Sequence, residues 1–188
     1  MADQDTPGVT QEEVAQRARP VIAAIVPMDS QDRRVPVTPE AAKTYVAAGW
    51  DVRVPRGGGL RSGYTDGAYE EAGATLVDEQ QLLDGAHVAV CVSVPSDAFV
   101  DALPEGVMLA GFLDPFQQPA RIGRLAKRGV TSLALELVPR TTIAQSMDGL
   151  SSQASLAGYA AVTLAASKLA KALPMMSTPA GTIKPARV

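Results

Sequence analysis

Short apolar runs alternate with helix-like stretches along most of the chain. Runs of four to six mostly apolar residues, bounded by Gly, Pro or polar residues, are typical of buried strands. The predicted strands are Val21–Val26, Trp50–Val54, Val88–Val92, Val107–Phe112 and Ser132–Leu137. The predicted helices are Pro39–Ala48, Asp66–Ala72, Gln80–Leu83, Asp97–Leu103 and Pro119–Arg128. Repeated β-then-α units with apolar strands predict an α/β fold, a doubly wound, mainly parallel sheet of about six strands, flavodoxin-like or Rossmann-like.

The same pattern divides the chain into three segments. Residues 1–19 are polar without an apolar stripe, and we expect a flexible N-terminal tail there. Residues 20–150 form the predicted α/β domain. Residues 151–188 are predicted to hold a long helix, from about Ser152 to Leu173, which Pro174 ends. The residues after the helix contain three prolines and one glycine, which is typical of a linker leading to another unit.

Composition narrows the class of protein. Hydrophobic residues make up 46% and charged residues 20%, and the formal net charge of −3 is spread along the chain without a long block of either sign. This argues against nucleic acid or an anionic membrane as a partner. Cys91 is the only cysteine, so no disulfide can form within the chain, as expected in a reducing cytoplasm. No apolar run approaches the roughly 18 residues of a spanning helix, so we expect no direct membrane insertion.

Polar side chains gather where the last predicted strand meets the long helix. They are Arg140, Gln145, Asp148, Ser151 and Tyr159. Connections at the carboxyl end of a strand are where open α/β sheets bind ligands. A guanidinium suits a carboxamide, carboxylate or phosphate, and an amide can bond sugar hydroxyls in both directions. By residue chemistry alone, Arg140 could equally be a solvated side chain, Asp148 a turn former and Ser151 a helix cap.

Three other features have simpler interpretations. Gly57–Gly59 follows a strand, but no Lys-Ser/Thr comes after it, so we expect a flexible turn and no phosphate loop. His87 opens a strand and is predicted to be a sheet-end residue. Cys91 lies within a strand and is predicted to be an inert core residue.

The run P-R-T-T-I-A-Q-S-M-D-G-L-S-S-Q-A-S-L-A-G-Y, residues 139–159, resembles the nicotinamide-side loop of proton-translocating NAD(P) transhydrogenases, in the alpha subunit that binds NAD(H). The resemblance implies direct hydride transfer between NADH and NADP+, with NADP(H) on a partner subunit and no metal. It implies catalytic positioning of the nicotinamide by Arg140, Asp148 and Ser151. It also implies cofactor contacts from Gln145 at the ribose, from Arg140, and from Tyr159 between loop and helix.

A second run, D-R-R-V-P-V-T-P from Asp32 to Pro39, resembles a segment shared by transhydrogenases and alanine dehydrogenases. In alanine dehydrogenases its second arginine, Arg34 here, grips the substrate carboxylate. That branch also carries a lysine where this chain has Ser93 and a catalytic histidine where it has Asp114. Without an imidazole, oxidative deamination lacks its acid and base. The resemblance therefore favours the transhydrogenase branch over an alanine dehydrogenase-like oxidoreductase.

The resemblance covers the N-terminal lobe of a two-lobed subunit, and no G-x-G-x-x-G turn of a Rossmann NAD-binding lobe follows it in this sequence. Three possibilities stay open: a transhydrogenase component completed by a separately encoded NAD-binding lobe, a truncated product, or a non-catalytic regulatory or assembly module. The first implies membrane and NADP-binding partner subunits, a homodimer in the assembly, and a cytoplasmic location peripheral to the inner membrane. We expect the isolated chain to be inactive and to bind NADH weakly or not at all.

Overall fold

The computed structural model describes residues 19–27, 31–92 and 96–187. The predicted tail and Ser93 therefore lie outside the described residues, apart from Arg19. The chain divides into two compact units, residues 1–135 and 136–188, and the division falls within the predicted 20–150 domain. Each unit is described by itself.

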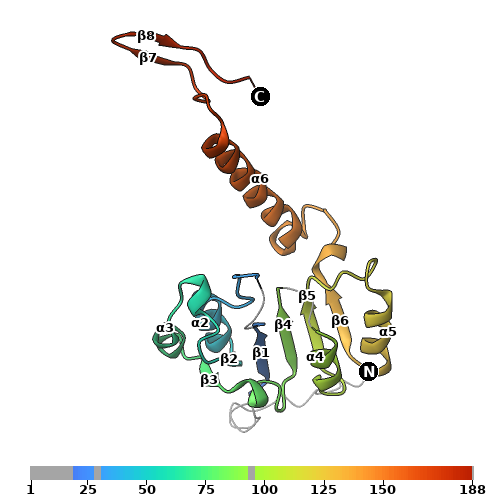
Figure 1. Cartoon of the computed structure of the whole chain (residues 1–188). Helices are drawn as coiled ribbons and strands as arrows, with labels where there is room; N and C mark the ends of the chain where they lie inside the picture. The colour runs from blue at the N-terminus through green and yellow to red at the C-terminus, as the bar shows by residue number, and fades with distance from the viewer. Residues whose placement is uncertain (1–18, 28–30, 93–95, 188) are drawn as a thin grey trace, which may run out of the picture. The chain divides into compact units, whose positions relative to one another are not determined.

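The first unit contains a parallel six-stranded sheet with the order β3-β2-β1-β4-β5-β6 (Figure 1). Its strands are β1 (Val21–Ile25), β2 (Asp51–Pro55), β3 (Thr75–Val77), β4 (Val88–Cys91), β5 (Met108–Gly111) and β6 (Thr131–Ala134). The predicted fold class is confirmed. The order changes direction between β1 and β4, which is the point where open sheets of this kind bind ligands beyond the carboxyl ends of the strands.

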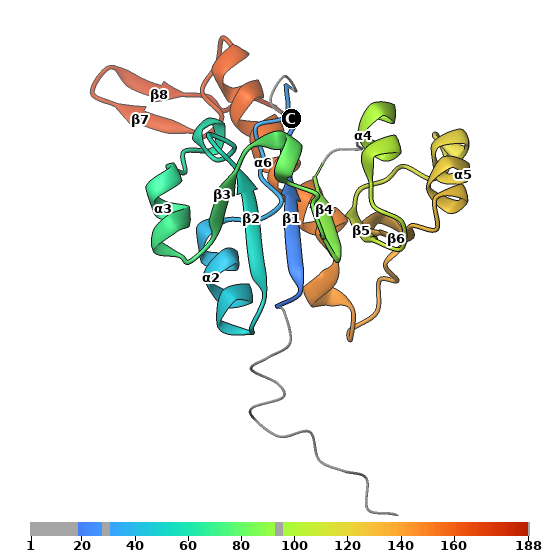
Figure 2. The ribbon, with the colours of Figure 1, turned by 90° about the horizontal axis from the view of Figure 1, so that it is seen from below.

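Helices cover both faces of this sheet. They are α2 (Pro39–Ala47), α3 (Asp66–Glu71), α4 (Asp97–Ala102) and α5 (Pro119–Lys127). Figure 2 shows α2 and α3 on one face and α4 and α5 on the other. The start of α2 at Pro39 follows from its capping residue. The hydroxyl oxygen of Thr38 accepts a hydrogen bond from Ala41 N at 3.2 Å, and Pro39 occupies the first helical position.

The central strand β1 contributes to two separate apolar cores. Ala23 and Ile25 pack into the core under α4 and α5, which also contains Leu103, Leu109 and Leu125. Ala24 packs into the core under α2 and α3. Every residue of β1 is buried, because side chains alternate across the sheet and both faces are covered.

Three elements of the first unit differ from the predicted segments. The strand predicted at Ser132–Leu137 ends at Ala134, and a 3-10 turn follows it. β3 has only three residues and no apolar run of its own in the sequence, so no strand was predicted there. It forms one edge of the sheet. The predicted helix Gln80–Leu83 is a single 3-10 turn, Glu79–Gln81. A turn this short offers too few positions for an apolar stripe to distinguish helix types.

The second unit begins within the 3-10 turn Leu135–Leu137 and continues with irregular chain and a second turn, Gln145–Met147. It continues with α6 (Gly149–Lys168) and an antiparallel hairpin of β7 (Met176–Thr178) and β8 (Gly181–Ile183). The long helix therefore starts and ends earlier than the predicted Ser152–Leu173, and the hairpin lies in the predicted linker. Among the described residues of this unit, only Ala144 is buried. No helix in the described portion of the chain combines the length and apolar character needed to cross a membrane.

Candidate functional site

All five predicted site residues belong to the second unit. Arg140 and Gln145 lie in the connection that leads to α6, Asp148 is the residue at which the helix begins, and Ser151 and Tyr159 lie on the helix. Figure 1 shows this connection and α6 as one continuous stretch of chain. The local turn is closed by backbone hydrogen bonds, Ala144 N to Thr141 O at 3.0 Å and Asp148 N to Gln145 O at 3.3 Å.

Asp148 caps α6. Its Oδ1 atom accepts a hydrogen bond from Ser151 N at 2.9 Å, and its carbonyl oxygen accepts one from the Ser152 hydroxyl at 3.1 Å. The cap satisfies one of the N–H groups that a helix leaves without a partner in its first turn. Asp148 and Ser151 are therefore brought together, and the contact between them is structural.

The charge on Asp148 is favoured by its surroundings. Hydrogen bonds from Ser151, through its hydroxyl and its backbone N–H, lower the pKa of the Asp148 carboxyl, and the positive charge of Arg140 lowers it further. Asp148 therefore stays a hydrogen-bond acceptor as pH falls below the usual range for an aspartate.

The remaining predicted residues lie further apart. Arg140 and Gln145 are exposed. Tyr159 has 74% of its surface exposed and lies eight residues beyond Ser151, about 12 Å along the helix axis at 1.5 Å per residue. In this chain, Asp148 and Ser151 are hydrogen-bonded, and the positive charge of Arg140 lowers the pKa of Asp148. Tyr159 lies about two turns away.

Taken singly, these groups supply donors and acceptors of the kinds that can bind an amide and a sugar hydroxyl. A carboxylate offers about four acceptor sites, so the bonds from Ser151 leave capacity on Asp148 for an amide N–H. Arg140 supplies fixed donors for a carbonyl oxygen, and Gln145 can donate and accept. The set contains no imidazole or thiol, which suits positioning better than proton transfer.

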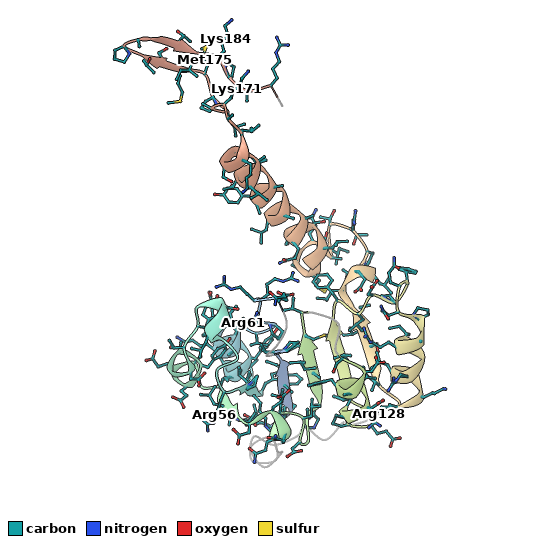
Figure 3. The ribbon with its side chains drawn as sticks, in the orientation of Figure 1. Arg56, Arg61, Arg128, Lys171, Met175 and Lys184 are labelled. Carbon is teal, nitrogen blue, oxygen red and sulfur yellow. The ribbon has the colours of Figure 1, made fainter. Side chains whose placement is uncertain are left out.

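A second group of polar residues lies beyond the carboxyl ends of β1 and β2 in the first unit. Both oxygens of Asp32 bind the guanidinium of Arg34, at 3.0 Å to Nε and 2.6 Å to Nη2. This hydrogen bonding raises the pKa of Arg34. Arg33 Nε donates to the carbonyl oxygen of Arg61 at 2.9 Å, and the Ser62 hydroxyl donates to the carbonyl oxygen of Arg33. Figure 3 shows Arg61 beside this loop.

These contacts argue against Arg34 as a binding site for a ligand carboxylate in this chain. A ligand carboxylate would have to compete with Asp32, which already binds the guanidinium in a two-point geometry. The link between Arg33 and residues 61–62 was missed by sequence reasoning, because it joins positions almost thirty residues apart. The only available signal was the concentration of arginines in two loops that each follow a strand.

Asp114 follows β5 and has a left-handed backbone, with φ of 52°. Its carbonyl oxygen accepts hydrogen bonds from Gln117 N at 3.2 Å and Gln118 N at 2.9 Å, which form the turn into α5. Asp can adopt this conformation because its short polar side chain bonds locally. The position predicted to replace a catalytic histidine thus has a clear structural role in this chain.

Other predicted features of the first unit have structural roles too. His87 Nδ1 accepts a hydrogen bond from Val21 N at 3.1 Å and so joins the amino ends of β4 and β1, as predicted. Gly57 N donates to Asp66 Oδ1 at 2.9 Å, so this glycine turn is fastened to α3. Within the described residues, no three His, Cys, Asp or Glu side chains gather in a way that could hold a metal ion.

Comparison with known proteins identifies the family. The family model described as alanine dehydrogenase/PNT, N-terminal domain, matches residues 26–157. This chain belongs to that family. The match includes both the Asp32–Pro39 segment and most of the Pro139–Tyr159 run, so the resemblance inferred from those residues is confirmed.

Individual relatives point to the transhydrogenase branch. The chain is 42% identical over 161 residues to the first portion of the divided NAD(P) transhydrogenase subunit alpha of Rhodospirillum rubrum, covering 82% of this chain and 42% of that protein. The crystal structure of a transhydrogenase from Sinorhizobium meliloti matches with a TM-score of 0.83 and 39% identity, covering 88% of this chain and 50% of that one. An L-alanine dehydrogenase structure matches with a TM-score of 0.60 and 26% identity, covering 63% and 33%.

The chain therefore corresponds to the N-terminal lobe of a transhydrogenase alpha subunit. It spans about two fifths of the length of the Rhodospirillum rubrum relative.

Proposed function

We propose that this chain is the NAD(H)-side first lobe of an NAD(P) transhydrogenase, in which hydride passes directly between NADH and NADP+. The observation that carries the proposal is the ordered run from Pro139 to Tyr159 at the start of α6, in a chain 42% identical to a transhydrogenase alpha subunit component. In the proposal, Arg140, Asp148 and Ser151 orient the nicotinamide, Gln145 contacts its ribose and Tyr159 contacts the loop from the helix.

The chain's own contribution is positioning. When bound, NAD(H) supplies the hydride donor or acceptor. Arg140 would hold the carboxamide oxygen, and Asp148 would accept from the amide N–H while Ser151 holds its carboxylate in place. Fixing the ring in this way removes rotational freedom before the reaction, and such orientation lowers a barrier substantially. NADP(H) lies on a partner subunit in this scheme, and no residue of the site is assigned to a metal.

A partner must complete the site. α6 carries no charged side chain from Gly149 to Ser167, and all but two of these residues, Gly149 and Gln153, are exposed. A helix that presents no charged face over so many residues, with Leu, Val and Ala on all sides, is normally covered by other parts of a protein. This supports an NAD-binding lobe that covers α6 and supplies the pyrophosphate site. Membrane and NADP-binding subunits would add proton coupling, with this lobe peripheral to the inner membrane and paired with a second copy.

The test combines binding and reconstitution. NADH titrated into the isolated chain should give no micromolar binding by calorimetry, while the chain mixed with its NAD-binding lobe and NADP-binding subunit should transfer hydride from NADH to an NADP+ analogue. If the chain binds an intact transhydrogenase but no hydride transfer depends on it, the alternative of a non-catalytic regulatory module is favoured. Micromolar NADH binding by the chain alone would place the cofactor site elsewhere.

Arg140→Ala is the sharpest single variant. We expect hydride transfer in the reconstituted complex to fall about 10-fold to 100-fold, because the ring loses its fixed donor. The circular dichroism spectrum of the chain should not change, since Arg140 is exposed. Arg56→Ala, at an exposed position outside the proposed site, is the matched control and should retain full turnover. Full turnover in Arg140→Ala would remove this residue from the site.

A further inference from the structure

The connection that leads to α6 carries exposed apolar side chains among its polar ones. Its large apolar side chains with substantial exposure are Leu137, Ile143, Met147 and Leu150. Single exposed apolar side chains are common on protein surfaces, but several on one short connection mark a surface that makes contacts. The five predicted site residues supply polar atoms, so these side chains add an apolar component to the same stretch of chain.

Met147 lies between two of the predicted site residues. It ends the 3-10 turn Gln145–Met147, and Asp148 follows it directly. Side chains three positions apart eclipse one another in a 3-10 turn, so Gln145 and Asp148 share one side of the turn. Met147 lies on the neighbouring side. Its side chain therefore borders the polar groups without replacing any of them.

The backbone holds Met147 in place while its side chain stays exposed. Met147 N donates to the carbonyl oxygen of Ala144 at 2.9 Å, and Ala144 is the one buried residue among the described residues of the second unit. On the other side, Asp148 is fixed as the cap of α6. Even so, 57% of Met147 is exposed. An apolar side chain that the fold positions but does not bury is available to a ligand.

The chemistry of a thioether suits the part of a nicotinamide that polar groups do not bind. The ring has two apolar faces and a polar carboxamide at its edge. Small-molecule sites are lined mainly by apolar side chains, with a few polar groups that fix orientation. Methionine is flexible and polarizable, and its sulfur makes favourable contacts with aromatic rings. Arg140 and Asp148 can hold the carboxamide, but neither provides a surface for the ring.

We propose that Met147 is a further positioning residue of the nicotinamide site. Its side chain packs against one face of the ring and keeps water from that face, which leaves the other face open to the ring of NADP(H). The inference rests on the proposed function and deepens it by adding an apolar contact to the polar ones. No bond of Met147 forms or breaks in this role.

Substitution of Met147 in the reconstituted complex tests the contact. Met147→Gln keeps the length of the side chain but makes it polar, and it should lower kcat for hydride transfer about tenfold. KM for NADH should change about threefold at most, because the rest of the dinucleotide binds to the other lobe. Met147→Leu keeps the apolar contact and should stay within about twofold of the wild type.

The control is Tyr45→Gln, at an exposed position on α2 outside the site, which should retain full turnover. Circular dichroism of the chain should be the same for all variants, since Met147 caps no helix and is exposed. Full turnover in Met147→Gln, or equal losses in Met147→Gln and Met147→Leu, would overturn the proposal.

Oxidative footprinting of the wild-type complex tests the contact without any substitution. Hydrogen peroxide transfers one oxygen atom to an accessible thioether, which gives the sulfoxide and water, and peptide mass spectrometry measures the rate. Saturating NAD+ should slow oxidation of Met147 about threefold or more, because oxidation follows exposure of the sulfur. ADP-ribose, which lacks the nicotinamide ring, should not protect Met147. Met175 is exposed and outside the site, so its rate should be the same with either ligand.

The outcomes separate this inference from the proposed function. Equal protection of Met147 by NAD+ and ADP-ribose, or by neither, would overturn the role of Met147, while hydride transfer by the same complex would leave the proposed function standing. A wild-type complex that transfers no hydride would contradict the proposed function, and the role of Met147 would fall with it.

Discussion

At the scale of single residues, Asp148 has two separable roles. It is the cap of α6 in this structure, and it is the proposed acceptor for the nicotinamide amide. The cap needs only a short side chain with an acceptor oxygen, which Asn also provides, whereas Ala provides none. The cap forms with or without the charge, although the charge strengthens it.

Asp148→Asn and Asp148→Ala should therefore behave differently. We expect Ala to reduce the helix signal of the chain in circular dichroism, while Asn keeps it. Both should lower hydride transfer in the reconstituted complex. The pKa of Asp148 is lowered in the folded chain, so the charged cap contributes above the unfolded value and is lost only as pH falls through the folded value. Equal loss of helix in Asn and Ala would show that the charge itself sustains the cap.

Tyr69 is the largest fully buried side chain among the residues that the structure describes, and its hydroxyl donates to the carbonyl oxygen of Val37 at 2.8 Å. Tyr69→Phe leaves that carbonyl without its partner inside the core. We expect the free energy of unfolding in urea to fall by about 1–3 kcal/mol. Unchanged stability would mean that the Val37 carbonyl finds another donor.

The same residue gives a pH dependence. Burial raises the pKa of Tyr69 to about 12, from about 10 in an unfolded chain. The neutral phenol therefore stabilises the fold fully below pH 10, and this contribution is lost as pH rises through about 12. The melting temperature of the wild type should thus fall faster than that of Tyr69→Phe between pH 10 and 12.

At the scale of elements, the glycine turn after β2 owes its shape to close packing. A Cβ atom on Gly59 would lie 2.6 Å from the Tyr69 ring and 2.8 Å from the Tyr64 carbonyl oxygen. Gly59→Ala should cost about 1–3 kcal/mol of unfolding free energy in urea, because the α3 core must shift. Gly67→Ala on α3 is the control, since its Cβ would meet only Thr65 Oγ1 at 4.0 Å. Equal stability of the two variants would contradict this account of the turn.

Strands and helices could be predicted from the sequence where their burial requires a run or stripe of apolar residues. β1, β4 and β5 are apolar runs because they lie inside a covered sheet, whereas β2 alternates polar residues with the buried Val52 and Val54. The Thr38 and Ser96 caps mark two helix starts. β3 was not predicted because an edge strand of three residues has little of its length buried. β7 and β8 were not predicted because none of their residues is buried in the chain.

The candidate site shows the same limit. The order of residues from Pro139 to Tyr159 identified the family, since that order is a property of the sequence. Residue types at the helix start predicted a possible cap at Ser151, but the structure has the cap three residues earlier, at Asp148. The binding of Arg34 by Asp32 and of Arg33 by the Arg61 carbonyl could not be predicted, because the loops that meet are set by the sheet topology.

At the scale of the whole molecule, the two units should differ in stability. The first unit has two apolar cores, whereas only Ala144 is buried among the described residues of the second. Amides open locally with free energies that range from about zero to the full unfolding value, according to how much apolar packing holds them. Hydrogen exchange of the isolated chain should thus be slow in β1, β4 and β5 and fast in α6.

Adding the NAD-binding lobe should change this profile at one place. If that lobe covers the uncharged surface of α6, amides between residues 150 and 168 should become protected while those of α4 and α5 do not change. A lobe from an unrelated Rossmann protein is the control and should protect nothing. Most helical stability in proteins comes from tertiary packing, which α6 lacks in this chain, so strong protection requires contact with a partner. Slow exchange in α6 before any partner is added would show that the chain itself already covers the helix.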